Sequence, residues 1–115
     1  MKFIKTLIVA GLLGFSVPVL AHTDMLQSHP ADGAMMMEPV HNLQLKFGSQ
    51  VRLVNVKVID SANKPVSIGF KPMMEPGQEF TVPMPMLKPD NYTVHWTVMG
   101  NDGHKMKGSF GFMQH

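Results

Sequence analysis

The chain has 115 residues, which is enough for one domain, and it carries a formal net charge of +2. It has no cysteine, which excludes disulfides, thiolate metal sites and cysteine nucleophiles. Methionine is frequent, with 12 residues, and its thioether can either fill irregular gaps in a core or bind a soft metal ion.

The first 21 residues have the pattern of a secretory signal peptide. Two lysines precede an apolar run over residues 7–17, and Ala21 offers a small residue at the cleavage position. A membrane anchor is the alternative, but only 16 residues lie between the second lysine and His22, fewer than the roughly 20 that a spanning helix needs. We therefore predict cleavage after Ala21 and export of residues 22–115.

Loss of the signal peptide changes the charge of the protein. Removing 21 of the 115 residues leaves 94 and takes away two lysines, so that eight Lys and Arg remain against eight Asp and Glu. A chain with zero net charge has no electrostatic basis for binding nucleic acid, so no such partner is expected. No stop-transfer segment follows, so the mature chain is not expected to span a membrane.

Beyond the signal peptide, apolar and polar residues alternate over five short segments, which is typical of half-buried strands. In chain order these segments are 43–47, 54–58, 79–82, 92–99 and 106–112. Turn-like stretches rich in proline, glycine, aspartate and asparagine separate them, at 30–33, 60–65, 75–77 and 88–91. Short strands at this spacing predict one all-β domain, a sandwich or barrel, with Trp96 in its core.

Cleavage after Ala21 would make His22 the first residue of the mature chain. A terminal histidine has an α-amine and an imidazole, whose reference pKa values of about 8 and about 6.5 allow both to bind a metal ion near neutral pH. Nitrogen donors in a tetragonal arrangement suit Cu(II) above other divalent ions. The alternative is that this position is an accident of processing, because a terminal histidine alone is weak evidence.

A second candidate is the segment Asn101-Asp102-Gly103-His104. If its backbone is extended, the side chains of Asp102 and His104 point to the same side and could bind one ion through a carboxylate and an imidazole. Gly103 would allow a close approach or a tight turn. The alternative is an ordinary hairpin loop, since Asn-Asp-Gly is common turn sequence.

The methionines form three groups, Met35–Met37, Met73–Met74 and the pair Met84 and Met86. Thioethers prefer Cu(I) to Cu(II), so one of these groups could bind reduced copper. Three consecutive strand residues cannot all face one side, so Met35–Met37 cannot act as ligands together. The alternative is that the methionines fill the core. The other histidines are more often solvated than ligands; they are His29, which could add a donor near the N-terminus, His41, His95 and His115.

Several segments together resemble the CopC family of periplasmic copper-binding proteins. They are Ala21-His22 at the end of the signal peptide, Ser-His-Pro-Ala-Asp-Gly at 28–33, Leu-Gln-Leu-Lys-Phe at 43–47, residues 89–96 and residues 102–110. They follow the family's order and cover nearly all of the mature chain. The last segment is the most specific, with Trp96 eight residues before the metal-site histidine. The resemblance implies a small Greek-key β-sandwich, similar to a cupredoxin or an immunoglobulin-like barrel.

The resemblance also implies a set of copper ligands. The family binds Cu(II) with the amine and imidazole of the first mature residue and with an Asp and a His of a late loop, which here are His22, Asp102 and His104. Family members often have a glutamate after the first long strand, where this chain has Gly48-Ser49-Gln50. Other members have a Met-rich Cu(I) segment after the second strand, where residues 59–65 contain no methionine. A family Cu(I) site is therefore not implied.

These observations predict a periplasmic protein, not an enzyme, that carries or buffers Cu(II), with Cu(I) as a second candidate cargo. Its role would be copper homeostasis, resistance or transport, and the family's usual partner is an inner-membrane copper importer of the CopD type. One alternative is a small oxidative enzyme with an N-terminal histidine copper site, although 94 residues leave little room for a polymer-binding surface. Another is a metal-free interaction module, which copper would not stabilise.

Overall fold

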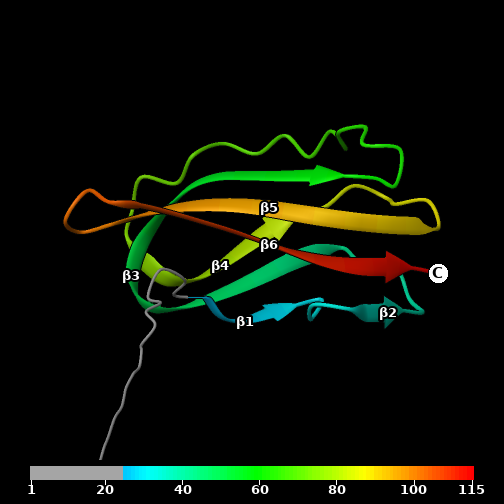
Figure 1. Ribbon diagram of the computed structural model, residues 1–115, viewed down its shortest axis with the longest axis horizontal. Coiled ribbons are helices and arrows are strands. Elements are labelled where there is room, and N and C mark those ends of the chain that lie inside the picture. The colour runs from blue at the N-terminus through cyan, green and yellow to red at the C-terminus, as the bar shows by residue number, and fades with distance from the viewer. Residues whose placement is uncertain (1–24) are drawn as a thin grey trace, which may run out of the picture.

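The computed structural model describes residues 25–115, which form six β-strands (Figure 1). The strands are β1 (Met25–His29), β2 (Ala34–Met36), β3 (Asn42–Ile59), β4 (Gly77–Pro83), β5 (Asp90–Gly100) and β6 (Lys105–Gln114). This part of the chain contains no helix, and so none that could cross a membrane. The predicted signal peptide, its cleavage after Ala21 and the predicted ligand His22 lie outside the described residues.

The long strand β3 contributes to both layers of the fold. Its first half pairs antiparallel with β1 on one side and with β4 on the other. Its second half pairs antiparallel with β5, which continues through β6 to the short parallel strand β2. Figure 1 shows β3 curling at one end of the molecule. The predicted all-β sandwich is confirmed, but the predicted segments 43–47 and 54–58 belong to one bent strand.

Trp96 lies in the core between the layers, as predicted, with only 2% of its surface exposed. The ring of Phe47 meets it edge to face, with centroids 5.2 Å apart, and lies 6.0 Å from the ring of Phe80. Gly108 lies directly against the indole, and a β-carbon at that position would overlap the ring. The close approach of β6 to Trp96 therefore requires glycine at this position.

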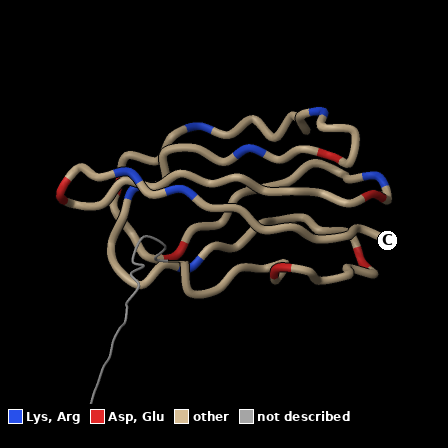
Figure 2. Tube along the Cα trace, in the orientation of Figure 1, with Lys and Arg blue, Asp and Glu red and all other residues tan. Residues whose placement is uncertain are grey.

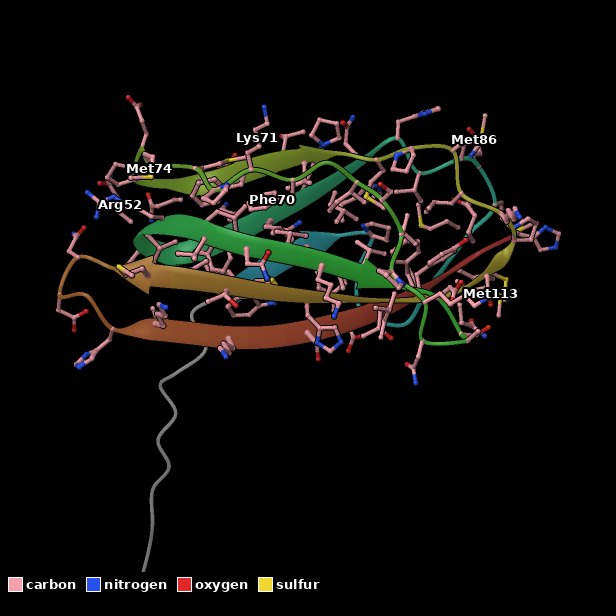
Figure 3. The ribbon with its side chains drawn as sticks, turned by 90° about the horizontal axis from the view of Figure 1, so that it is seen from above. Arg52, Phe70, Lys71, Met74, Met86 and Met113 are labelled. Carbon is pink, nitrogen blue, oxygen red and sulfur yellow. The ribbon has the colours of Figure 1, made fainter. Side chains whose placement is uncertain are left out.

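The connection between β3 and β4 packs along the edge of β3 without forming a regular strand. The N–H of Met73 donates to the carbonyl of Leu53 at 2.9 Å, and Arg52 Nε donates to the carbonyl of Met74 at 2.8 Å. Figure 3 shows Arg52 and Met74 at the same end of this connection. Its half-buried apolar side chains are Val66, Ile68, Phe70 and Met73. The connection thus protects an edge strand from pairing with other chains.

Strand pairing brings the start of the described chain and the β5–β6 connection to the same end of the sandwich. Met25 pairs with Phe47 just before the curl of β3, and Val51 pairs with Gly100 just after it. Both features lie on the left of Figure 1. We refer to this region, around residues 100–105, as the hairpin end.

The opposite end contains β2 and the last residues of β6, and we refer to residues 34–41 and 112–115 as the C-terminal end. β5 and β6 pair continuously from Asp90 with Gln114 to Met99 with Lys105. At about 3.4 Å per residue, this ladder separates the two ends by about 30 Å.

Candidate metal centre

Asp102 and His104 lie in the tight connection between β5 and β6. The N–H of Gly100 donates to the carbonyl of His104 at 2.9 Å, and the N–H of Gly103 donates to the carbonyl of Gly100 at 3.0 Å. Gly103 has a φ of 85°, a left-handed conformation that a β-carbon would strain. The segment is therefore the hairpin turn that the alternative interpretation predicted, and not an extended stretch.

The turn nevertheless brings the two side chains together. Asp102 Oδ1 accepts the N–H of His104 at 3.0 Å, and Asp102 Oδ2 lies 2.9 Å from His104 Nδ1. The His104 side chain is 85% exposed and that of Asp102 is 66% exposed. The N–H bond, followed by the contact with the imidazole, lowers the pKa of Asp102 below its usual range. The hairpin tip thus offers solvent an anionic oxygen beside an imidazole nitrogen.

The pair is not a complete metal site by itself. Among residues 25–115, no three His, Asp or Glu side chains lie close enough together to hold an ion. A tetragonal Cu(II) ion takes about four donors in its plane, so two are too few. Gln50 lies in the curl of β3, at the same end of the sandwich, and is exposed, but its side chain is a neutral amide and not a carboxylate.

The other histidines of the described chain lie away from the hairpin tip. His95 is exposed in the middle of β5, and His115 is exposed at the C-terminus. His29 ends β1, and together with His41 it lines an open cleft at the C-terminal end. His29 is therefore not placed to add a donor to the hairpin pair.

Most methionines of the described chain either pack against the core or are exposed, and Met99 and Met113 are half-buried elsewhere. Those that are buried or half-buried against the core are Met25, Met36, Met73, Met84 and Met106. Those that are exposed are Met35, Met37, Met74 and Met86, at 58%, 65%, 76% and 80%. Figure 3 shows Met74 and Met86 towards opposite ends of the molecule, so these two cannot bind one ion together. Core filling explains the first group only.

Charged residues of both signs are spread along the described chain. Figure 2 shows Lys and Arg interspersed with Asp and Glu along the strands and their connections. A cation would therefore be held by individual ligands and not by a general acidic surface.

Sequence comparisons place the chain among known proteins. A family model described as the CopC domain matches residues 25–115. Protein YobA of Escherichia coli (strain K12) is 30% identical over 98 residues, covering 82% of this chain and 79% of that protein. Copper resistance protein C of Xanthomonas campestris pv. juglandis is 24% identical over 106 residues, covering 84% and 83%.

Structural comparisons agree. The crystal structure of CopC from Methylosinus trichosporium OB3b superimposes with a TM-score of 0.69 at 25% identity, covering 81% of this chain and 93% of that one. PcoC from Escherichia coli, described as a methionine-rich copper resistance protein, has the same fold, with a TM-score of 0.66 at 20% identity and coverage of 83% and 100%. Since the family model spans every described residue, this chain belongs to the CopC family, which includes copper resistance proteins.

Proposed function

We propose that this protein is a periplasmic carrier or buffer of copper that holds one Cu(II) ion with His22, Asp102 and His104. The observation that carries the proposal is the 2.9 Å contact between Asp102 Oδ2 and His104 Nδ1 at the exposed hairpin tip. Membership of the CopC family and the relative named copper resistance protein C support copper as the cargo. The predicted signal peptide would direct the protein to the periplasm.

The separation of the two donor atoms suits neighbouring positions on one ion. Ligand nitrogen and oxygen atoms lie about 2.0–2.2 Å from a divalent ion, so two ligands at right angles are about 2.9 Å apart. One ion could therefore bind both atoms once it replaces their hydrogen bond and the imidazole turns its Nδ1 lone pair towards the ion. The lowered pKa of Asp102 favours the ionised carboxylate that a metal ion requires.

His22 is proposed to supply the remaining donors through its α-amine and its imidazole. Met25 lies at the hairpin end, and the two residues that separate it from His22 allow three extended steps of the chain, or about 10 Å. The proposal requires this segment to run towards the hairpin tip. Three nitrogens and one carboxylate oxygen form a donor set that suits tetragonal Cu(II).

The exposure of the hairpin pair supports a role in transfer. An ion held at the tip of an exposed loop can be reached by an acceptor protein without unfolding of the donor. We propose that the acceptor is a membrane copper importer of the CopD type. This role requires reversible binding of copper and no chemical conversion of a substrate.

A copper titration of residues 22–115 tests the proposal. The mature protein should bind one Cu(II), with three nitrogen donors visible by electron paramagnetic resonance. One extra residue before His22 should remove the amine donor, and His104→Ala should remove one imidazole, whereas His95→Ala should change nothing. Equal binding by the extended and the native termini would overturn the proposed ligand set, as would a processed terminus other than His22 by mass spectrometry.

A further inference from the structure

Four cations project from the outer face of the sheet that the second half of β3, β5 and β6 form. Strand alternation puts them on this face, because the residues that alternate with them face the core. The strand register places them in three adjacent cross-strand rows. They are Arg52, Lys57, Lys105 and Lys107, all of them exposed, and we refer to them as the basic face.

No carboxylate neutralises the basic face from within its own strands. Residues 51–59, 91–100 and 105–114 contain no Asp or Glu. Figure 2 shows blue positions along these strands and red positions at their ends. The acidic residues at those ends are Asp60, Asp90 and Asp102. Within residues 25–115 no Lys or Arg forms an ion pair with a carboxylate, so the four cations face solvent.

The opposite sheet has a different distribution of charge. There Lys46 of β3 lies directly across from Glu79 of β4, so that a cation faces an anion. The Debye length is about 8 Å at physiological ionic strength, so a partner in contact with the basic face responds to that face and not to the net charge of the protein. The absence of net charge in the predicted mature chain therefore does not prevent binding of an anionic surface here.

We propose that the basic face binds the protein to a membrane surface that contains anionic phospholipids. Strand geometry spreads the four cations over about 10 by 17 Å, so they cannot converge on one small anion. Thr97 and Ser109 lie among them, whereas a protein interface is typically centred on aromatic anchors and is depleted in lysine. Lysine is instead a point charge that anionic headgroups attract.

The position of the basic face would bring the hairpin tip close to the bilayer. Lys105 directly follows His104 in the chain, and both belong to the hairpin end. A protein lying on its basic face would therefore present the hairpin tip at the level of the headgroups. Binding to the bilayer involves neither Asp102 nor His104, so it does not depend on copper.

Cosedimentation of copper-free residues 22–115 with lipid vesicles at low ionic strength tests the proposal. Vesicles of phosphatidylglycerol and phosphatidylcholine in equal amounts should bind the protein, and vesicles of phosphatidylcholine alone should not. Binding should be lost at about 1 M salt, where the Debye length is about 3 Å. Lys57→Gln/Lys107→Gln should weaken binding roughly 25-fold, because each lysine near an anionic surface contributes about fivefold.

The matched control is Lys46→Gln/Lys71→Gln, which changes the net charge equally outside the basic face and should bind vesicles as the wild type does. Figure 3 shows Lys71 on the side of the molecule away from β5 and β6. His104→Ala should also bind as the wild type does, which separates this proposal from the Cu(II) site.

Three results would overturn the membrane proposal. One is equal binding by the two double variants, because the basic face would then have no special role. Another is the absence of binding to the anionic vesicles. The third is binding of poly-L-glutamate at least as tight, per unit charge, as binding of the vesicles, which would assign the basic face to an acidic protein.

Discussion

The two ends of the sandwich present metal-binding groups in different ways. At the hairpin end, Asp102 and His104 offer oxygen and nitrogen from a short loop, and both side chains are mostly exposed. At the C-terminal end, sulfur and nitrogen groups line a cleft whose backbone is tied to the buried amide of Gln114. The groups at the hairpin end are therefore on an exposed loop, whereas those at the C-terminal end are on backbone that hydrogen bonds to Gln114 hold in place.

The two ends also differ in whether the described residues supply all of the groups that are present there. The hairpin pair needs donors from outside the described residues, because no third His, Asp or Glu adjoins it within residues 25–115. The cleft at the C-terminal end is lined by described residues alone. Copper at the hairpin tip is proposed to bind together with the chain terminus, so its binding depends on processing.

Replacement of Gln114 by alanine should have the largest effect, and at the C-terminal end only. It leaves one N–H and two carbonyls without their partner, which costs about 3 kcal/mol. For a domain of this size the melting temperature should fall by more than about 10 °C. Cu(II) affinity of the folded protein should be unchanged. Gln27→Ala, at an exposed position of β1, is the matched control; unchanged melting by Gln114→Ala would contradict the prediction.

Asp102→Asn should act at the hairpin end only. The amide oxygen can still accept the N–H of His104, so the turn is kept, but the anionic ligand is lost. Cu(II) affinity should fall by 10- to 100-fold, or roughly 1.4–2.7 kcal/mol, in competition with a chromophoric chelator. Asp32→Asn is the control, because Asp32 Oδ1 also accepts a backbone N–H, from Gly111 at 2.9 Å. Full copper affinity in Asp102→Asn would exclude the carboxylate as a ligand.

Gly103→Ala should strain the backbone of the hairpin turn while leaving the side chains of the proposed ligands unchanged. A β-carbon at a φ of 85° costs roughly 1–2 kcal/mol, so Cu(II) affinity should fall several-fold. Gly103→Asn should lose less, because asparagine tolerates the left-handed conformation. If alanine and asparagine have the same effect on copper affinity, backbone strain is not the cause.

The fold was largely predictable because alternation along a strand reports burial on one face. The buried Leu43, Leu45 and Phe47 and the central Trp96 follow that pattern. β1 and β2 were missed because neither has a fully buried residue, and each is held mainly by backbone pairing. The curl of β3 was predicted as a break between the segments 43–47 and 54–58. A bend within one strand and a short connection between two strands interrupt the alternation in the same way.

The hairpin pair was predictable from residue chemistry and spacing, and the turn that carries it is the hairpin loop that Asn-Asp-Gly suggests. The cleft was not predicted as a group: His29 and the Met35–Met37 run were each candidates, but His41 was expected to be solvated. Their proximity depends on the parallel pairing of β2 with the end of β6, far along the chain. The sequence shows Met35 and Met37 at alternate positions. Only the fold shows that His29 and His41 line the same cleft.

The smallest effect concerns Tyr92, at the C-terminal end. Its hydroxyl donates to the carbonyl of Lys88 at 2.6 Å, an arrangement similar to the tyrosine corner of β-sandwiches. Burial, followed by the charges of Asp90 and Asp60, raises the pKa of Tyr92. Because the unfolded value is about 10, this contribution to stability is fully present below about pH 10 and is lost as the pH rises through the folded pKa.

Tyr92→Phe should remove this alkaline loss and cost about 1 kcal/mol at neutral pH, the net value of one hydrogen bond. Melting temperatures from pH 7 to pH 11 should therefore converge for the two proteins, since only the wild type has a phenol to ionise at this position. The hairpin end should not take part, so Gly103→Ala should lower the melting temperature of both proteins equally at each pH. Parallel curves for wild type and Tyr92→Phe would show that ionisation of Tyr92 does not limit stability.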